Sequence, residues 1–382
     1  MNSTNHDITL KIPVKVLFCC TGVGIFNRGI ESFFRESFDG LKDAMPGIEC
    51  SLIKGAGPSS DREKTVWCLP RTGKLAEFLG RLIRRNAYVV EQLSSFPAVV
   101  LQIRKFKPDV IFYSDSNLGF QLYFKRKFIG VPFKLLFSNG GPIHAPFVRT
   151  DYVHQVAPLY FNDAIKAGEP EDKHFMVPYG IDAGPPPKID AVQKAQIRRK
   201  LGLPVERPIV LSVGWIAKQH KRMDYLIREV AAMPAPRPFL QLLGAIDEES
   251  AEIIELGNLL LGPENISVKS VPYSQVGDYY QAADCFVLAS LKEGFGRVYL
   301  EALKHGLPTI AHRFPVMDFV LGDVGIQGDL SSEGELSRIL SEQLRHPVDQ
   351  SSANRRWESV RDRFSWKVLA DEYAGMFRKV SR

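Results

Sequence analysis

The stretch that most constrains the fold is residues 283–311, ADCFVLASLKEGFGRVYLEALKHGLPTIA. Its apolar run at 285–289 predicts a buried strand of a parallel sheet, and residues 292–296 predict a glycine loop. A short helix is expected over 297–304, because His305-Gly306 and then Pro308 end it. The next strand begins at residue 307, so the stretch predicts a strand–helix–strand unit of an α/β fold.

The side chains inside this unit fit a particular ligand. Gly294 and Gly296 let the backbone approach a ligand, and the N-terminus of the following helix favours an anion. Arg297 adds a positive charge, and Glu301 lies on the same helix face, where a carboxylate can accept both hydrogen bonds of a ribose diol. Glu293, on the loop, can hold the hydroxyl groups of a second moiety. Phosphate, diol and polyhydroxyl together describe a nucleotide sugar; the alternative is an ordinary strand–helix–strand unit with an Arg297–Glu301 surface pair.

The size and composition of the chain predict a two-domain globular protein. Its 382 residues exceed the size at which one hydrophobic core stops growing. No apolar run is long enough to span a membrane, and Lys11 and Lys15 interrupt the first apolar run, which argues against a secretory signal. The five cysteines are odd in number and lack CxxC spacing, so a reducing, cytoplasmic setting is expected.

The positive charge is concentrated in the first half. Residues 1–180 hold 23 Lys and Arg against 17 Asp and Glu, which accounts for the whole net charge of +6. This bias predicts an anionic partner, such as a phosphorylated or phospholipid-linked acceptor, with a simple solubility surface as the alternative. An amphipathic helix is expected over 75–93, with an apolar stripe and a basic side; contact with an anionic membrane and an ordinary solvated face are the two interpretations. No nucleic-acid partner is expected.

The first half is expected to begin with a strand over 14–20. The loop that follows carries Gly22 and Gly24 and leads into a helix, an arrangement that can cradle a phosphate or a sugar. A dinucleotide fingerprint is incomplete there, because no third glycine stands at residue 27. Residues 138–142, SNGGP, follow another strand, over 134–137, and are expected at the same ligand-binding edge as Gly22.

The second half is expected to begin with a strand over 208–213, followed by the basic loop GWIAKQHKRM. This loop carries Lys218, His220, Lys221 and Arg222, and from the residues alone it can be an ordinary solvated basic loop. The sequence has no Asp-x-Asp, no His and Cys ligand cluster and no P-loop string. Neither a metal nor a cofactor is therefore expected.

The string from Glu293 to Glu301, with YYQAADCFVLASLKEGFG, LEALKHGLPTIA and FSWKVLADEYAGMF, resembles the E-x7-E region of retaining glycosyltransferases of family 4, also called glycosyl transferases group 1. The resemblance covers about residues 206–378 most strongly. It implies the GT-B fold, in which two Rossmann-like domains face each other across a cleft, and a metal-independent transfer of a hexose from a UDP- or GDP-linked sugar to an acceptor hydroxyl with retention of configuration.

The resemblance also implies roles for individual residues. Lys221 matches a family lysine that neutralises the donor diphosphate, and Arg222 or Lys218 can supply the charge of a missing family arginine. The expected catalytic group is Lys221, Glu293 and Arg222. The expected substrate-binding group is Gly22, Gly24, Asn139, Gly294, Phe295, Gly296, Arg297, Val298 and Glu301. Four positions depart from the family pattern. Trp215 stands where an arginine is usual and Asn139 stands near a usual histidine. Arg222 occupies the place of a common glycine, and Tyr179 replaces an asparagine in the interdomain segment VPYGID.

The domains are expected over 1–183, on the acceptor side, and 184–361, which binds the nucleotide sugar, with the stiff run Gly184-Pro185-Pro186-Pro187 as linker. A terminal helix over 362–380 is expected to pack back on the first domain. The location is expected to be cytoplasmic, peripheral to the inner membrane face. Three alternatives remain: a sucrose- or trehalose-type synthase or phosphorylase of the same fold, a non-catalytic GT-B subunit that binds a partner enzyme, and a dinucleotide-dependent oxidoreductase.

Overall fold

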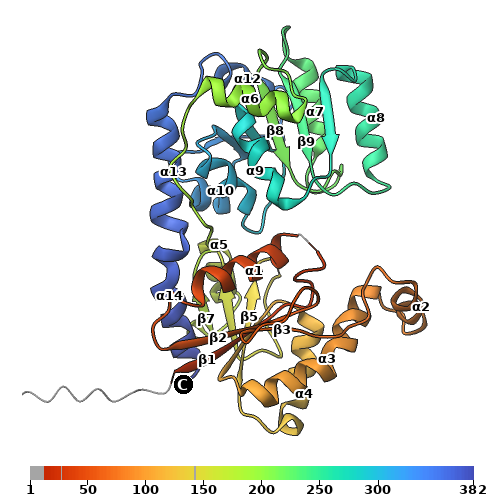
Figure 1. Ribbon diagram of the computed structural model, residues 1–382, viewed down its shortest axis with the longest axis vertical. Coiled ribbons are helices and arrows are strands. Elements are labelled where there is room, and N and C mark those ends of the chain that lie inside the picture. The colour runs from red at the N-terminus through yellow and green to blue at the C-terminus, as the bar shows by residue number, and fades with distance from the viewer. Residues whose placement is uncertain (1–12, 27, 142) are drawn as a thin grey trace, which may run out of the picture. The chain divides into compact units, whose positions relative to one another are not determined.

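The computed structural model describes residues 13–26, 28–141 and 143–382, which divide into two compact units (Figure 1). Unit 1 runs up to Val156 and includes Tyr160–Gly180 and Leu369–Arg382. Unit 2 comprises Ala157–Leu159 and Ile181–Val368. Lys11 and Pro142, which figured in the sequence argument, lie outside the described residues.

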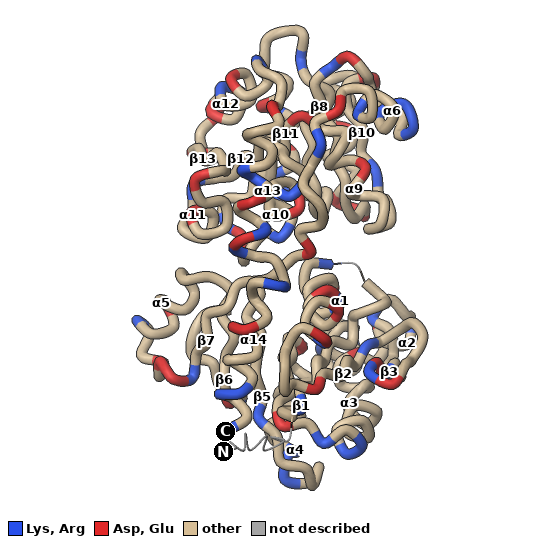
Figure 2. Tube along the Cα trace, turned by 60° about the vertical axis from the view of Figure 1, so that its left-hand side comes forward, with Lys and Arg blue, Asp and Glu red and all other residues tan. Residues whose placement is uncertain are grey.

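Unit 1 is built on a seven-stranded parallel sheet in the order β3-β2-β1-β4-β5-β6-β7. Its strands are β1 (Val14–Cys19), β2 (Ile48–Lys54), β3 (Glu63–Thr65), β4 (Val110–Tyr113), β5 (Lys134–Asn139), β6 (Tyr152–Gln155) and β7 (His174–Met176). Its helices are α1 (Gly29–Leu41), α2 (Lys74–Leu82), α3 (Ala87–Phe106), α4 (Ser116–Ile129), α5 (Pro158–Lys166) and the short η1 (Glu171–Lys173). Basic residues lie over the adjoining ends of α3 and α4 (Figure 2).

Unit 2 is built on a six-stranded parallel sheet in the order β10-β9-β8-β11-β12-β13. Its strands are β8 (Ile209–Val213), β9 (Phe239–Leu243), β10 (Ile266–Lys269), β11 (Cys285–Leu288), β12 (Thr309–His312) and β13 (Ile326–Gly328). Its helices are α6 (Ala191–Leu201), α7 (Met223–Ala232), α8 (Ser250–Leu261), α9 (Tyr273–Ala282), α10 (Arg297–Lys304), α11 (Pro315–Leu321), α12 (Glu335–Gln343) and α13 (Gln350–Phe364).

The core of unit 1 is rich in phenylalanine. Phe18 on β1 makes edge-to-face contacts with Phe38 on α1, Phe112 on β4 and Phe377, at centroid distances of 5.8, 5.4 and 5.8 Å. Phe377 belongs to the last helix, α14 (Trp366–Val380), and Tyr373 on the same helix donates a 3.1 Å hydrogen bond to the carbonyl of Pro178. The end of the chain is thereby packed into the core of the first unit.

The two parallel sheets, each built from alternating strands and helices, confirm the α/β prediction and the strand–helix–strand unit over 283–311. Each sheet has a topological switch point, where the chain order reverses: between β1 and β4 in unit 1, and between β8 and β11 in unit 2. Ligands of open α/β sheets bind beyond the carboxyl ends of the strands at such a point. Ligands are therefore expected at the loops after β1, β4, β8 and β11.

The prediction of a single helix over 75–93 is wrong, because the structure forms two helices there. α2 ends at Leu82, Arg84 takes a left-handed conformation with φ of 53°, and the N–H of Arg85 bonds the carbonyl of Gly80 at 2.8 Å. α3 then begins after Asn86, whose side chain caps it by accepting a hydrogen bond from the N–H of Val89. The local cap and the left-handed residue together end one helix and start another.

The terminal helix predicted over 362–380 is likewise two elements. α13 continues to Phe364, Ser365 is extended, and α14 begins at Trp366. The carbonyl of Phe364 accepts from the N–H of Ile181 at 2.8 Å, and the N–H of Trp366 donates to the carbonyl of Ile181 at 3.3 Å. Ile181 thus takes over backbone groups that a continuous helix would have bonded internally.

No helix among the described residues has both the length and the apolar character that crossing a bilayer requires.

Candidate functional site

The switch point of unit 2 brings two candidate residues into direct contact. Lys221 lies on the loop after β8, and Glu293 lies on the loop after β11. The Nζ of Lys221 donates to Oε1 of Glu293 at 2.6 Å, and the two side chains are 20% and 9% exposed. His220 Nδ1 lies 3.8 Å from the same oxygen. An ion pair across the two switch-point loops places both charges at the edge where a ligand is expected.

Glu301 on α10 is held by two tyrosines that the sequence argument did not single out. Tyr273 donates to its Oε1 at 3.2 Å and Tyr280 to its Oε2 at 3.0 Å, while the residue itself is 7% exposed. Burial, and then the Glu301 charge, raises the pKa of Tyr280 well above its ordinary value, so that this phenol stays a donor. His305 stacks on the Tyr280 ring, with centroids 5.2 Å apart. The carboxylate is therefore fixed in place with both oxygens accepting hydrogen bonds from hydroxyl groups.

The start of α10 has the geometry predicted for an anion site. Gly296 immediately precedes the helix with φ of 74°, and a Cβ there would lie 2.5 Å from the Tyr299 ring. Arg297 in the first turn is 7% exposed, and the Phe295 ring packs against Phe364 at 5.9 Å. The Phe295 side chain thus points into the fold, which leaves its backbone to contact a ligand. Gly294 and Val298 are half-buried on either side.

The Arg222 side chain donates hydrogen bonds to backbone carbonyl groups of unit 2. It lies just before α7 in a left-handed conformation with φ of 50°, and its Nη1 donates to the carbonyl of Leu330 at 2.5 Å and to that of Ala289 at 3.4 Å. Its guanidinium carbon also lies 4.2 Å from the Tyr225 ring centroid. These contacts fasten the end of β11 to a distant loop, while leaving the positive charge without a carboxylate partner among the described residues.

Trp215 occupies the position where an arginine was expected from the resemblance. Its Nε1 donates to Oδ2 of Asp247 at 2.7 Å, and the residue is 39% exposed. Asp247 lies on the loop after β9, so the indole ties two neighbouring strand ends together. The candidate cations of this site are then Lys221, Arg222 and Arg297, and Lys218 is exposed on the same loop after β8.

In unit 1 the two candidate glycines permit close packing of the loop after β1. Gly24 has φ of 84°, and a Cβ there would lie 2.4 Å from the carbonyl oxygen of Ala56. A Cβ on Gly22 would lie 2.5 Å from Oε1 of Glu31. The loop therefore needs small residues for contacts within the fold, and it places the Glu31 carboxylate directly against the glycine loop.

Asn139 ends β5 and is 1% exposed. Its Nδ2 donates to Oε1 of Gln155 at 2.9 Å and to the carbonyl of Ile143 at 3.1 Å. Within the described part of the chain, its Oδ1 has no hydrogen-bond partner. Asn139 therefore holds in place the loop that was predicted at the ligand-binding edge. Its Oδ1 can accept a further hydrogen bond.

His154 on β6 is a structural histidine. Its Nδ1 lies 3.0 Å from Oγ of Ser138 and its Nε2 lies 2.7 Å from the carbonyl of Val177. Burial lowers the pKa of His154 to about 4, so the ring is neutral at ordinary pH. Its neutral tautomer joins three neighbouring segments of the sheet.

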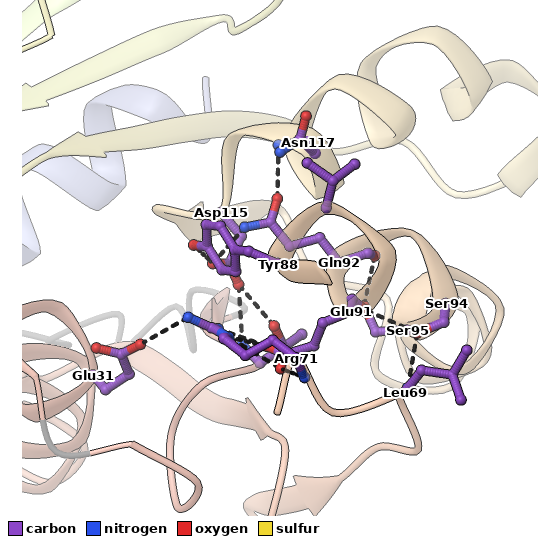
Figure 3. Close-up of polar contacts among 12 residues, drawn as sticks. Glu31, Leu69, Arg71, Tyr88, Glu91, Gln92, Ser94, Ser95, Asp115 and Asn117 are labelled. Carbon is purple, nitrogen blue, oxygen red and sulfur yellow. Dashed lines mark hydrogen bonds and ion pairs between the residues drawn. The ribbon is translucent and has the colours of Figure 1, made fainter. Parts of the chain in front are cut away.

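The structure also shows a buried polar cluster at the switch point of unit 1 that sequence reasoning missed (Figure 3). We call Glu31, Arg71, Tyr88, Glu91 and Asp115 the Arg71 cluster. The Arg71 guanidinium donates to Oε1 of Glu91 at 2.5 and 3.0 Å and lies 3.8 Å from Oε1 of Glu31. Its charged carbon also lies 4.0 Å from the Tyr88 ring centroid. One cation here contacts two carboxylates, and Tyr88, on which it stacks, donates to a third, that of Asp115.

Asp115 anchors the Arg71 cluster to the sheet edge. It is 2% exposed and accepts from Tyr88 Oη at 2.8 Å, from Gln92 Nε2 at 3.2 Å and from the backbone N–H and hydroxyl of Thr21, both at 3.1 Å. Burial raises the pKa of Asp115 despite these bonds. Asp115 comes two residues after β4, so its place directly after a strand was the sequence signal that could have found it.

Comparison with known proteins bears on both units. Residues 193–337 match the family model described as Glycosyl transferases group 1. A D-inositol 3-phosphate glycosyltransferase of Xylanimonas cellulosilytica is 31% identical over 146 residues, which cover 37% of this chain and 35% of the relative. An alpha-monoglucosyldiacylglycerol synthase of Streptococcus pneumoniae is 26% identical over 178 residues, covering 44% and 39%. The matches thus span well under two thirds of either relative.

The crystal structure of Anabaena HepE in complex with UDP-glucose has a similar fold, with a TM-score of 0.73 at 15% identity over 95% of this chain and 99% of that one. The chain therefore has the predicted GT-B fold, with two Rossmann-like units. The predicted resemblance to family 4 glycosyltransferases is confirmed, with the family match on the part that holds Lys221, Glu293 and Glu301.

Proposed function

We propose that this protein is a retaining glycosyltransferase that moves a hexose from a UDP- or GDP-linked sugar to an acceptor hydroxyl. One observation carries the proposal: Lys221 and Glu293 form an ion pair at the switch point of unit 2, within the segment that matches the family model. Unit 2 is proposed to bind the nucleotide sugar, and unit 1 the acceptor.

Each side chain has a proposed task toward the donor. Glu301 accepts hydrogen bonds from the ribose diol, in exchange for those that it now accepts from Tyr273 and Tyr280. The N–H groups over 294–298 and the Arg297 charge hold the diphosphate at the start of α10. Glu293 holds hydroxyl groups of the sugar, and its contact with Lys221 keeps that ammonium close to the phosphate next to the sugar.

In the proposed reaction the bond between the anomeric carbon and the diphosphate oxygen breaks, and a bond to the acceptor oxygen forms on the same face of the sugar. The acceptor proton passes to an oxygen of the departing diphosphate, so no enzyme nucleophile is required. Negative charge grows on the diphosphate as the bond breaks, and Lys221 and Arg222 stabilise it because their charges are already in position.

A transfer assay tests this proposal. The purified chain is incubated with UDP- and GDP-sugars and hydroxyl acceptors, both phosphorylated and lipid-borne, and release of the nucleoside diphosphate is measured. We expect Lys221→Ala and Glu293→Gln to lower kcat/KM by about 100-fold or more. Lys200→Ala is the matched control, because that lysine pairs with Asp278 at 2.8 Å but is 72% exposed and distant in sequence from the site. Equal activity in all variants contradicts these roles.

The stereochemistry is tested by proton NMR of the product. An α-linked donor is expected to give an α-linked product, and a β-linked product would refute retention. An acceptor that carries no lipid and reacts at full rate would favour the sucrose- or trehalose-type alternative.

The contact between Trp215 and Asp247 favours a second candidate function, a non-catalytic GT-B subunit, because an indole replaces a cation expected at the diphosphate. The two candidates differ in their response to Trp215→Arg. A catalytic protein gains or keeps transfer activity when the charge is added. A folded protein without transfer or hydrolysis of any sugar nucleotide, before and after that change, supports the non-catalytic role.

We also propose a cytoplasmic location. The five cysteines are free and buried, which suits a reducing compartment. Burial raises the pKa of Cys50 to about 12 and that of Cys68 to about 11, so these thiols are unreactive. Oxidation of the folded protein by glutathione disulfide, followed by mass spectrometry, is expected to leave all five thiols unmodified.

A further inference from the structure

Helix α2 is attached to unit 1 by its smallest residues. Ala76 and Gly80, one turn apart, are its buried positions. A Cβ on Gly80 would lie 2.7 Å from the carbonyl oxygen of Arg85, so the helix packs closely on the turn that follows it. The sequence predicted an apolar stripe along this segment, and the structure leaves Leu75, Leu82 and Ile83 of that stripe exposed.

The large apolar side chains of α2 face solvent. Leu75, Phe78 and Leu82 are 56%, 63% and 71% exposed, and their spacing of three and four residues puts them on one face of the helix. Ile83, at the end of the helix, is 47% exposed, and Trp67, on the segment that leads to α2, is 67% exposed. Unit 1 buries Ala76 and Gly80 of α2 but leaves this apolar face exposed, so the face does not stabilise the fold. An exposed apolar face of this kind is expected to bind a partner.

Basic residues border this apolar face. Lys74, Arg81, Arg84 and Arg85 are exposed, and none of them forms an ion pair with another described residue. Glu77 is the acidic residue between them, so the segment carries four cations against one carboxylate. α2 lies at the periphery of unit 1, beside α3 and apart from the sheet (Figure 1).

A lipid surface with negative charge has the complementary properties. α2 spans nine residues, which is too short to cross a bilayer but sufficient to lie in its interface with the apolar face inward. Arginine and lysine at the border of such a face are attracted to anionic head groups, and an exposed tryptophan prefers the same interface. A protein partner would need an acidic border of its own around an apolar groove.

We infer that α2 and the turn after it dock on the surface of an anionic phospholipid membrane. Docking itself does not require the proposed transferase activity. The acceptor class that docking implies does rest on it: unit 1 would receive a hydroxyl group that is borne by a membrane lipid.

Vesicle co-sedimentation of the full chain tests the apolar contact. Wild-type protein is expected to sediment with phosphatidylglycerol vesicles and to remain in solution with phosphatidylcholine vesicles. The triple variant Leu75→Ser, Phe78→Ser and Leu82→Ser is expected to lose at least about tenfold in vesicle affinity, since it removes three exposed apolar side chains. Leu259→Ser is the matched control, because Leu259 on α8 is 78% exposed and belongs to unit 2. It is expected to bind like wild type.

A second variant tests the charge. Arg84→Glu with Arg85→Glu is expected to lower affinity for anionic vesicles by about tenfold or more, because each basic residue near the surface contributes about fivefold. The control Arg199→Glu with Arg345→Glu changes net charge equally at exposed positions of unit 2 and is expected to have little effect. Binding is also expected to weaken as salt rises from 0.05 to about 0.5 M.

Three outcomes would overturn the inference. The first is that wild-type protein does not bind anionic vesicles. The second is that both α2 variants bind like wild type. The third is a dimer in sedimentation velocity that the triple α2 variant abolishes, because the apolar face then serves a second copy of the chain. Failure of docking is distinct from failure of the proposed function, because transfer to a detergent-solubilised or water-soluble acceptor is measured without vesicles.

Discussion

The carboxylate of Glu31 is the least compensated charge in the Arg71 cluster, and its removal makes a stability prediction with a definite sign. The residue is 7% exposed, and Arg71 lies 3.8 Å away, which is too far for a hydrogen bond. Arg71 donates instead to Glu91, at 2.5 Å. Burial therefore outweighs the attraction of Arg71 and raises the pKa of Glu31 above its ordinary value.

The pH dependence follows from that direction. Because the pKa of Glu31 is higher in the folded than in the unfolded protein, its contribution to stability is fully present below the unfolded value of about 4.3 and is lost as pH rises through the folded value. Glutamine has the same shape and no charge. We predict that Glu31→Gln raises the free energy of unfolding by about 1 kcal/mol at pH 8, from the cost of burying an imperfectly paired charge.

Calorimetric unfolding between pH 4 and pH 8 provides the assay. The advantage of Glu31→Gln over wild type is expected to be smallest at pH 4 and to grow toward a plateau as pH rises. Glu77→Gln, an exposed carboxylate on α2 without an ion pair among the described residues, is the control and is expected to show no such trend. The reasoning is refuted if Glu31→Gln destabilises the protein more at pH 8 than at pH 4, because that result requires a well-paired carboxylate.

Three further predictions follow from single contacts. Gly244→Ala places a Cβ 1.6 Å from the carbonyl oxygen of Gly214, so a loss of about 3 kcal/mol or more is expected in calorimetry, and unchanged stability would contradict the backbone geometry. Tyr280→Phe deprives buried Glu301 of a donor and is expected to cost about 1–3 kcal/mol; a neutral effect in the same measurement would mean that the bond is dispensable. Burial lowers the pKa of His154 to about 4, so nitrogen NMR is expected to show a neutral ring at pH 5. The contribution of His154 to the free energy of unfolding is expected to be lost as pH falls from about 6.5 through 4. Protonation of the ring near pH 6.5 would exclude its buried contacts.

The strand–helix–strand unit at β11, α10 and β12 could be predicted because its signals are local. Gly296 must adopt a left-handed conformation, Pro308 follows the helix, and the apolar run before the loop fits a buried strand. These signals lie within about 30 residues, and the structure forms the elements close to the expected bounds. The same stretch carried the resemblance to the family, so fold class and family likeness were accessible together.

The partners of the site residues could not be predicted, because they come from distant parts of the chain. Tyr280 reaches Glu301 from the preceding helix, and Lys221 reaches Glu293 from a loop 72 positions earlier. Arg71 lies in an irregular segment that gave no periodic signal, although it contacts the carboxylates of Glu31 and Glu91. Sequence spacing identifies which loops share a sheet edge, but the pairing of charges across that edge depends on tertiary packing.

For segment 75–93, the sequence could not show which residues of the helix the fold would bury. Its leucines have helical spacing, which usually marks a buried face, and Ala76 and Gly80 carry little weight in such a pattern. In the structure α2 packs through its small residues, because they allow the backbone to approach the next turn, and its large apolar residues are exposed. A periodic apolar pattern indicates a face; the structure decides whether the fold or a partner covers it.

Calorimetric titration with UDP, GDP, ADP and TDP, in the presence of EDTA, tests the central proposal most directly. We predict that one nucleotide binds without a divalent metal, and that Glu301→Ala weakens its binding by about 100-fold or more, since each hydrogen bond from the ribose to a charged group contributes about 1.5–3 kcal/mol. Glu255→Ala, an exposed carboxylate on α8, is the control and is expected to bind like wild type. A folded protein that binds none of the four nucleotides, or a Glu301→Ala variant that binds as tightly as wild type, would contradict a nucleotide-sugar site at α10.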